Sequence, residues 1–188
     1  MPRPSMREQL IEAARDRFHE HGFNGSGIKD ITDDAGVPKG SFYNHFESKE
    51  AMAVEVMRRY ADTRDMAMLE DRSTPPLERI RAHFAYLTAD LERFGYARGC
   101  LIGNFGAELS TQSVVIRDEV AQRLGRWSTL LALALDEARA AGTLTSTVDS
   151  TVLARFLVSA WEGAAMQAKV IGGAPLDDFF VVLKSLTG

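Results

Sequence analysis

Apolar residues recur at steps of three and four along nearly the whole chain of 188 residues. This spacing places them on one face of an α-helix, and no segment alternates convincingly in the manner of a β-strand. The longer predicted helices cover residues 5–21, 49–69, 75–94, 114–141, 148–171 and 175–186. Another helix is expected to start at Cys100. The pattern therefore predicts an all-α protein.

The ends of the predicted helices follow from capping residues. Ser5 is expected to cap the first helix, with Glu8 three residues later as its capping-box partner, and Gly22 ends it. The inner face of this helix is predicted to carry Met6, Leu10, Ala13, Ala14 and Phe18. Ser48 is expected to cap the helix of residues 49–69. Its inner stripe is predicted to be Met52, Val56, Tyr60 and Thr63.

Residues 26–46 contain two short predicted helices joined by a tight turn. The first begins at Ser26 and ends at Gly36, because glycine enters the left-handed region at little steric cost. Pro38 fits the first position of the second helix, where its missing N–H is not needed. The outer face of that helix carries Lys39, Gly40, Ser41, Tyr43, Asn44 and His45. A short helix with a small, polar, basic and aromatic free face suits a DNA major groove.

The run A-G-V-P-K-G-S-F-Y-N-H-F-E-S-K-E over residues 35–50 resembles the DNA-binding signature of the tetracycline-repressor (TetR) family. This resemblance implies a three-helix helix-turn-helix DNA-binding domain at residues 1–48 and a helical ligand-binding and dimerisation domain at residues 49–188. It places Lys39, Gly40, Ser41 and Tyr43 at base edges or nearby phosphates, beside Asn44 on the same face. It implies phosphate contacts for Ser26, Lys29, His45 and Lys49. The basic arm Pro2-Arg3-Pro4 could reach phosphates or a minor groove, although a frayed terminus is an equal alternative.

The net charge of −4 requires that any DNA contact be made by a local cationic face. No apolar run reaches the length of a membrane span, and the N-terminus lacks a signal-peptide pattern. A single cysteine rules out an internal disulfide framework and is consistent with a cytoplasmic location. No nucleophile–base pair, paired acids or metal-ligand set is apparent, so we expect no enzyme activity, no cofactor and no metal site.

The last two helices carry more apolar surface than one partner layer covers, which favours an interface. The family resemblance implies a homodimer through these helices, with an inverted-repeat operator in double-stranded DNA as its partner. The two reading helices would lie about 34–36 Å apart. The alternative is a helical interaction or adaptor protein without sequence-specific DNA binding.

The body is expected to hold a small apolar or electrophilic inducer. Candidate residues are Phe84, Cys100, Phe105, Trp127, Trp161, Met166 and Lys169. Aromatic residues at helical spacing also fit simple core packing. The segment around Cys100 resembles the N-ethylmaleimide-reductase repressor branch, in which a cysteine senses electrophiles and a later lysine, here Lys169, is its partner. Cys100 as a small buried hydrophobic residue is the alternative.

Overall fold

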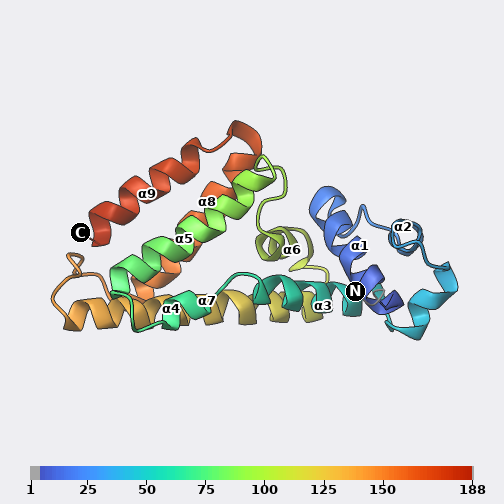
Figure 1. The fold of residues 1–188 in the computed structure, drawn as a ribbon, viewed down its shortest axis with the longest axis horizontal. Coiled ribbons are helices and arrows are strands. Elements are labelled where there is room, and N and C mark those ends of the chain that lie inside the picture. The colour runs from blue at the N-terminus through green and yellow to red at the C-terminus, as the bar shows by residue number, and fades with distance from the viewer. Residues whose placement is uncertain (1–4, 188) are drawn as a thin grey trace. The chain divides into compact units, whose positions relative to one another are not determined.

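The computed structural model describes residues 5–187 and confirms the all-α prediction: it contains helices and no strand within this range. The helices are α1 (Met6–His21), α2 (Ile28–Asp34), the 3₁₀ helix η1 (Lys39–Asn44), α3 (Lys49–Asp62), α4 (Ala67–Glu70), α5 (Pro76–Arg93), α6 (Leu101–Leu109), α7 (Val114–Ala140), α8 (Ser150–Ile171) and α9 (Ala174–Thr187) (Figure 1). None of these helices combines the length and the apolar character that crossing a membrane requires.

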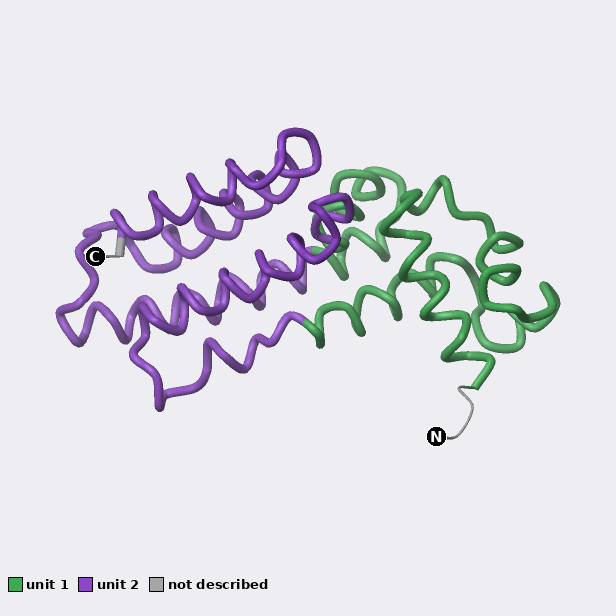
Figure 2. The backbone as a smooth tube through the Cα atoms, turned by 45° about the horizontal axis from the view of Figure 1, so that its top comes forward, with its two compact units in different colours: residues 1–63, 101–120 green, residues 64–100, 121–188 purple. Residues whose placement is uncertain are grey.

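The chain forms two compact units (Figure 2). Unit 1 comprises residues 1–63 and 101–120, and unit 2 comprises residues 64–100 and 121–188. Helix α6 is therefore grouped with the N-terminal helices, although it lies far from them in sequence. This structural grouping differs from the functional division at residue 48, which stays a prediction.

The core of unit 1 joins α1, α3 and α6. Phe105 of α6 is fully buried, and its ring lies 5.5 Å from that of Phe18 and 6.4 Å from that of Phe23. Both contacts are edge-to-face, the geometry that aromatic pairs favour. The buried carboxylate of Glu119 accepts a hydrogen bond at 2.9 Å from Arg58 of α3, which ties the start of α7 to the same unit.

The core of unit 2 is an aromatic cluster formed by α5, α7, α8 and α9. The Phe84 ring lies 4.8 Å from Phe179 and 5.7 Å from Trp127, and Trp127 lies 5.5 Å from Trp161. Each of these four residues is at most 6 % exposed. The extensive contact of α8 with α9 closes one side of this unit.

The helix predicted over residues 49–69 is interrupted, which corrects that prediction. Helix α3 ends at Asp62, Asp65 adopts a positive φ of 45°, and α4 is a separate turn. The buried guanidinium of Arg64 pairs with Asp90 at 2.9 Å, a contact 26 residues apart that holds this bend. Thr63, predicted to face inward, is exposed as a result.

The first helix largely follows its prediction. Ser5 accepts a hydrogen bond from the Glu8 N–H, and Gly22 ends α1 with a positive φ of 69°. The Glu8 carboxylate pairs with Arg59 of α3. Met6 is 50 % exposed, so its inward placement was wrong; Ile11, which was not predicted, is buried instead.

Candidate nucleic-acid interface and effector site

Helix η1 presents the side chains that the sequence singled out. Lys39, Gly40 and Asn44 are exposed and Tyr43 is 62 % exposed, while Ser41 and His45 are half-buried. Phe42 and Phe46 are buried and anchor η1 to the unit 1 core. A large exposed tyrosine beside a buried phenylalanine shows that two faces of η1 differ sharply in polarity.

The backbone around η1 has the predicted turn, but the helix starts one residue later than predicted. Gly36 has a positive φ of 65°, as expected for the end of α2. Pro38 precedes η1 in an extended conformation and serves as its N-cap, so the prediction of a first helical position for Pro38 was wrong. The Ser41 hydroxyl donates to the Pro38 carbonyl at 2.6 Å, which fixes this start.

Ser26 does not occupy the predicted position. The cap of α2 is Gly27, and Ser26 is fully buried with its hydroxyl donating to the Gly22 carbonyl at 2.6 Å. The prediction that Ser26 caps α2 was therefore wrong, and its expected phosphate contact stays a prediction.

Two of the predicted phosphate-binding lysines are already engaged. Lys49 Nζ donates to the carbonyls of Phe23 at 2.8 Å and Ser26 at 3.0 Å, and lies 4.0 Å from the centre of the Phe23 ring. Burial lowers the pKa of Lys49. Lys29 pairs with Asp33 one turn away at 2.5 Å. Lys39 is exposed and, among the described residues, pairs with no acid, which leaves its ammonium group accessible on the reading face.

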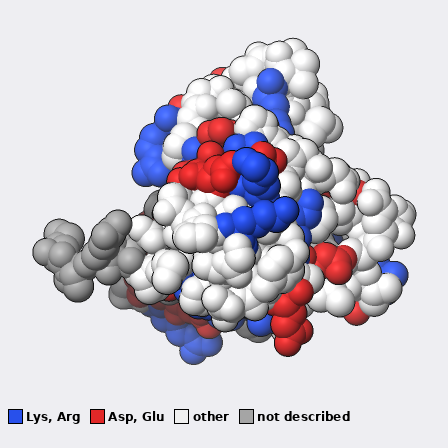
Figure 3. Space-filling model, turned by 90° about the vertical axis from the view of Figure 1, so that its right-hand side faces the viewer, with Lys and Arg blue, Asp and Glu red and all other residues white. Residues whose placement is uncertain are grey.

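Positive charges on the surface of unit 1 are interspersed with acids. Figure 3 shows blue and red atoms side by side rather than one continuous blue patch. Arg17 pairs with Asp34 at 2.8 Å, and Arg15 pairs with Glu12 at 2.9 Å. The arm of Pro2, Arg3 and Pro4 lies outside the described residues.

A clamp that the sequence did not reveal holds the turn of residues 23–26. The carboxylate of Glu108, on α6, accepts hydrogen bonds from the backbone N–H groups of Phe23 at 2.9 Å and Asn24 at 2.7 Å. Lys49 binds the carbonyls of the same turn. Donors and acceptors of this turn are thus held by opposite charges, and α6 is fixed directly to the segment that leads into α2.

The candidate effector residues separate into three groups. Phe84, Trp127 and Trp161 belong to the buried cluster of unit 2. Phe105 belongs to the core of unit 1, where its ring packs against that of Phe18, and its role in inducer binding stays a prediction. The remaining candidates lie on or near α8: Met166 is 60 % exposed, Lys169 is exposed, and Cys100 is buried.

The buried cluster of unit 2 contains polar groups. The Trp161 Nε1–H donates to Thr88 at 3.4 Å, whereas Trp127 Nε1 is buried without a hydrogen-bond partner among the described residues. His83 lies 5.9 Å from Trp127, and burial lowers its pKa to about 4, so its imidazole is neutral at pH 7.

Cys100 contacts an acid on α8, and the expected partnership with Lys169 stays a prediction. Its side chain hydrogen-bonds the carboxyl group of Glu162, whose pKa burial raises to about 7. Lys169 lies seven residues further along α8, which corresponds to about 10 Å of helix.

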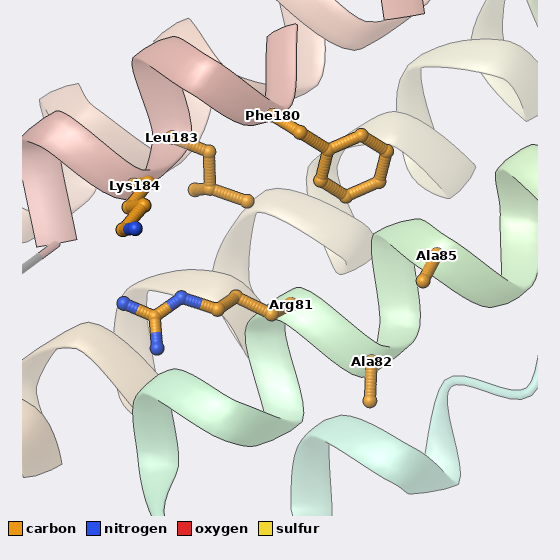
Figure 4. Close-up of a pocket in the computed structure, with 6 residues that line it drawn as sticks. All are labelled: Arg81, Ala82, Ala85, Phe180, Leu183 and Lys184. Carbon is orange, nitrogen blue, oxygen red and sulfur yellow. The ribbon is translucent and has the colours of Figure 1, made fainter. Parts of the chain in front are cut away.

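A groove runs between α5 and α9 on unit 2. Ala82, Ala85, Phe180 and Leu183 form its apolar walls, and Arg81 and Lys184 lie together at one end (Figure 4). Its volume of about 500 Å³ is within the range of small-molecule sites.

Comparison with known proteins decides the family. Residues 10–56 match the family model "Bacterial regulatory proteins, tetR family", and residues 76–179 match "Tetracyclin repressor-like, C-terminal domain". The chain belongs to the TetR family. It is therefore a TetR-type DNA-binding transcriptional regulator and not an enzyme.

Individual relatives of this TetR-family chain cover almost its full length. It is 37 % identical to the repressor DhaR of Mycobacterium sp. strain GP1 over 97 % of this chain and 92 % of the relative. It is 34 % identical to the transcriptional regulator AcuR of Cereibacter sphaeroides over 87 % and 76 % of the two chains. The crystal structure of reduced Escherichia coli NemR matches with a TM-score of 0.88 at 29 % identity, covering 97 % of both chains.

Membership of the TetR family accounts for the helix-turn-helix signature. The sequence analysis did not identify two acids of this TetR-family chain, Glu108 and Glu162, as functional candidates. Glu108 acts on a turn 84 and 85 residues away in sequence, which no local pattern reveals. Glu162 did leave a signal: it is the only acidic residue in the otherwise largely apolar α8.

Proposed function

We propose that this TetR-family regulator is a repressor that binds an inverted-repeat operator as a homodimer and is released by a small apolar or electrophilic inducer. The observation that carries DNA reading is the exposed face of η1, where Lys39 and Tyr43 project beside the buried anchor Phe42. Two relatives, DhaR and NemR, are named as repressors, which supports repression here.

The homodimer is supported by apolar surface on α8 and α9. Exposed side chains on these helices include Val152, Phe156, Met166, Val170, Ile171, Val181 and Val182. A groove between the two helices is lined by Phe156, Ile171 and Val182 among others. Apolar surface of this extent is costly in water, and a second copy of the same face is the partner that we propose for it.

Inducer binding is proposed for unit 2, whose buried cluster combines aromatic rings with the unpartnered Trp127 N–H. Such a lining favours a small, mainly apolar molecule that has a hydrogen-bond acceptor. An inducer changes operator affinity only through its different affinity for the two protein conformations. The attachment of α6 to the turn of residues 23–26 by Glu108 offers a mechanical route, because α6 directly follows Cys100 in the chain.

Operator selection from random duplexes, followed by gel shifts with Lys39→Ala and Tyr43→Ala, tests this proposal. Each variant is expected to lose at least about 30-fold in operator affinity, because a base contact of about 1–3 kcal/mol is lost in both half-sites. Arg72→Ala removes a cation that is 83 % exposed in unit 2 and serves as the matched control. Unchanged affinity of both η1 variants, or binding by a strict monomer, would refute the proposal.

A further inference from the structure

The strongest unexplained feature is the buried contact between Cys100 and Glu162 in unit 2. Cys100 is 7 % exposed, and its side chain hydrogen-bonds the Glu162 carboxyl group. Glu162 Oε1 is also buried, and it has no hydrogen-bond partner among the described residues. A buried carboxyl oxygen without a partner destabilises the fold, so its presence beside the only thiol of the chain indicates a role in chemistry.

The surroundings adjust this carboxyl group for proton transfer near neutrality. Burial raises the pKa of Glu162 to about 7, and the contact with Cys100 partly opposes the rise. Cys100 is the one titratable neighbour, among the described residues, that perturbs it. The other charged or titratable groups on α8, α5 and α9 include Arg155, Lys169, His83, Asp177, Asp178 and Lys184. Both protonation states of Glu162 are therefore populated at physiological pH.

We propose that Glu162 is the proton acceptor for Cys100 in conjugate addition of the thiol to small α,β-unsaturated carbonyl compounds. The thiol proton passes to the Glu162 carboxylate while sulfur forms a bond to the β-carbon. The C=C electron pair moves toward the carbonyl group, and the carboxylic acid then returns its proton to the α-carbon. No atom leaves and no oxidant is needed. The inference rests on the proposed function, in which the adduct is one form of the induced state.

A carboxylate works differently from the lysine that the sequence led us to expect. An ammonium group beside a thiol favours the thiolate and speeds its reaction directly. A carboxylate disfavours a neighbouring thiolate, so it accelerates the addition only by taking the proton as the S–C bond forms. The two mechanisms give opposite signs for removal of the charge at Glu162, which makes the proposal easy to test.

The test is the rate of adduct formation with methyl vinyl ketone, followed by intact mass between about pH 5.5 and 9. The chain has one cysteine, so any thiol adduct reports Cys100, and Cys100→Ser sets the background. The wild-type rate should rise through an inflection near pH 7, set by the Glu162 carboxyl group. Glu162→Gln should lose this inflection and react at least about 10-fold more slowly near pH 7.5. The exposed Glu78→Gln in α5 is the matched control and should behave as wild type.

A Glu162→Gln rate equal to or above that of the wild type would overturn the proposal. If this variant does not fold, Glu162→Asp decides: it should retain the inflection at a reduced rate, and a profile without the inflection would count against proton transfer. Gel shifts of the alkylated wild type separate the two proposals. Adducts that depend on Glu162 but leave the operator bound would refute induction by electrophiles while sustaining the role of Glu162.

Discussion

Removal of the Glu108 carboxylate should test how strongly α6 holds the turn of residues 23–26. Glu108→Ala breaks two hydrogen bonds, to the N–H groups of Phe23 at 2.9 Å and Asn24 at 2.7 Å. A hydrogen bond to a charged group contributes about 1.5–3 kcal/mol, and the Asn24 N–H can be rehydrated because it is exposed. We therefore expect a loss of about 3 kcal/mol in the free energy of unfolding. For a chain of this size that corresponds to a fall in Tm of about 6–12 °C.

Glu108→Gln discriminates between charge and simple packing. Glutamine has one acceptor oxygen, and its amide N–H₂ group would face one of the two backbone donors. The expected loss is at least half that of Glu108→Ala, although the side-chain volume is nearly unchanged. Operator affinity should fall in both variants, because the turn leads directly into α2.

Urea unfolding at neutral pH measures these effects, with Glu12→Ala as the control. That change removes an exposed ion pair with Arg15 and should cost under about 1 kcal/mol. The clamp would contribute nothing if the Glu108→Ala variant were as stable as the Glu12→Ala variant and bound the operator as tightly as the wild type.

Three further predictions concern a glycine at a helix end, a buried histidine and the proposed dimer face. Gly22→Ala should cost about 1–3 kcal/mol in urea unfolding, because φ is 69°. A Cβ would also lie 2.9 Å from Glu108 Oε2 and would displace that carboxylate. Gly142→Ala, with φ of 70° and no atom within 4 Å, should cost less. The pKa of His83 is about 4 in the folded protein and 6.5 in the unfolded chain, so the unfolded chain binds the proton first as the pH falls. The free energy of unfolding should therefore fall by up to about 3 kcal/mol between pH 6.5 and pH 4. His83→Phe should flatten this pH dependence, and an unchanged slope would contradict the prediction. Ile171→Glu with Val181→Glu, at positions 63 % and 69 % exposed, should convert a dimer to a monomer in light scattering, and a persistent dimer would exclude this face.

The helices themselves could be predicted from local features of the sequence. Ser5, Gly22 and Gly36 act where the capping rules place them, because a cap depends on a few neighbouring residues. The opposite faces of η1 were also predictable, since Phe42 and Tyr43 differ in polarity within one turn. Whether Lys39 and Tyr43 touch DNA is a property of a complex and stays a prediction.

Sequence patterns were least informative where a distant partner decides the outcome. The periodicity of Phe105 shows that it is buried but does not say in which core, and its ring joins Phe18 and Phe23. The end of α3 depends on Arg64 reaching Asp90, which helix propensity cannot anticipate. Lys49 was assigned to phosphate from its charge and position. Two backbone carbonyls hold its ammonium group in this structure, and the phosphate contact stays a prediction.

Glu108 and Glu162 lie in helices of very different character. Glu108 lies on a helix with a clear apolar face and a polar one, so an acid there is ordinary and its function emerges only from the fold. Glu162 follows the buried Trp161 in a helix that is apolar on several sides. An ionisable group in such a position costs stability unless it is paired or used. A lone acid in a largely apolar helix is therefore a signal that the sequence alone provides, and here it points to the residue that we propose as the proton acceptor for Cys100.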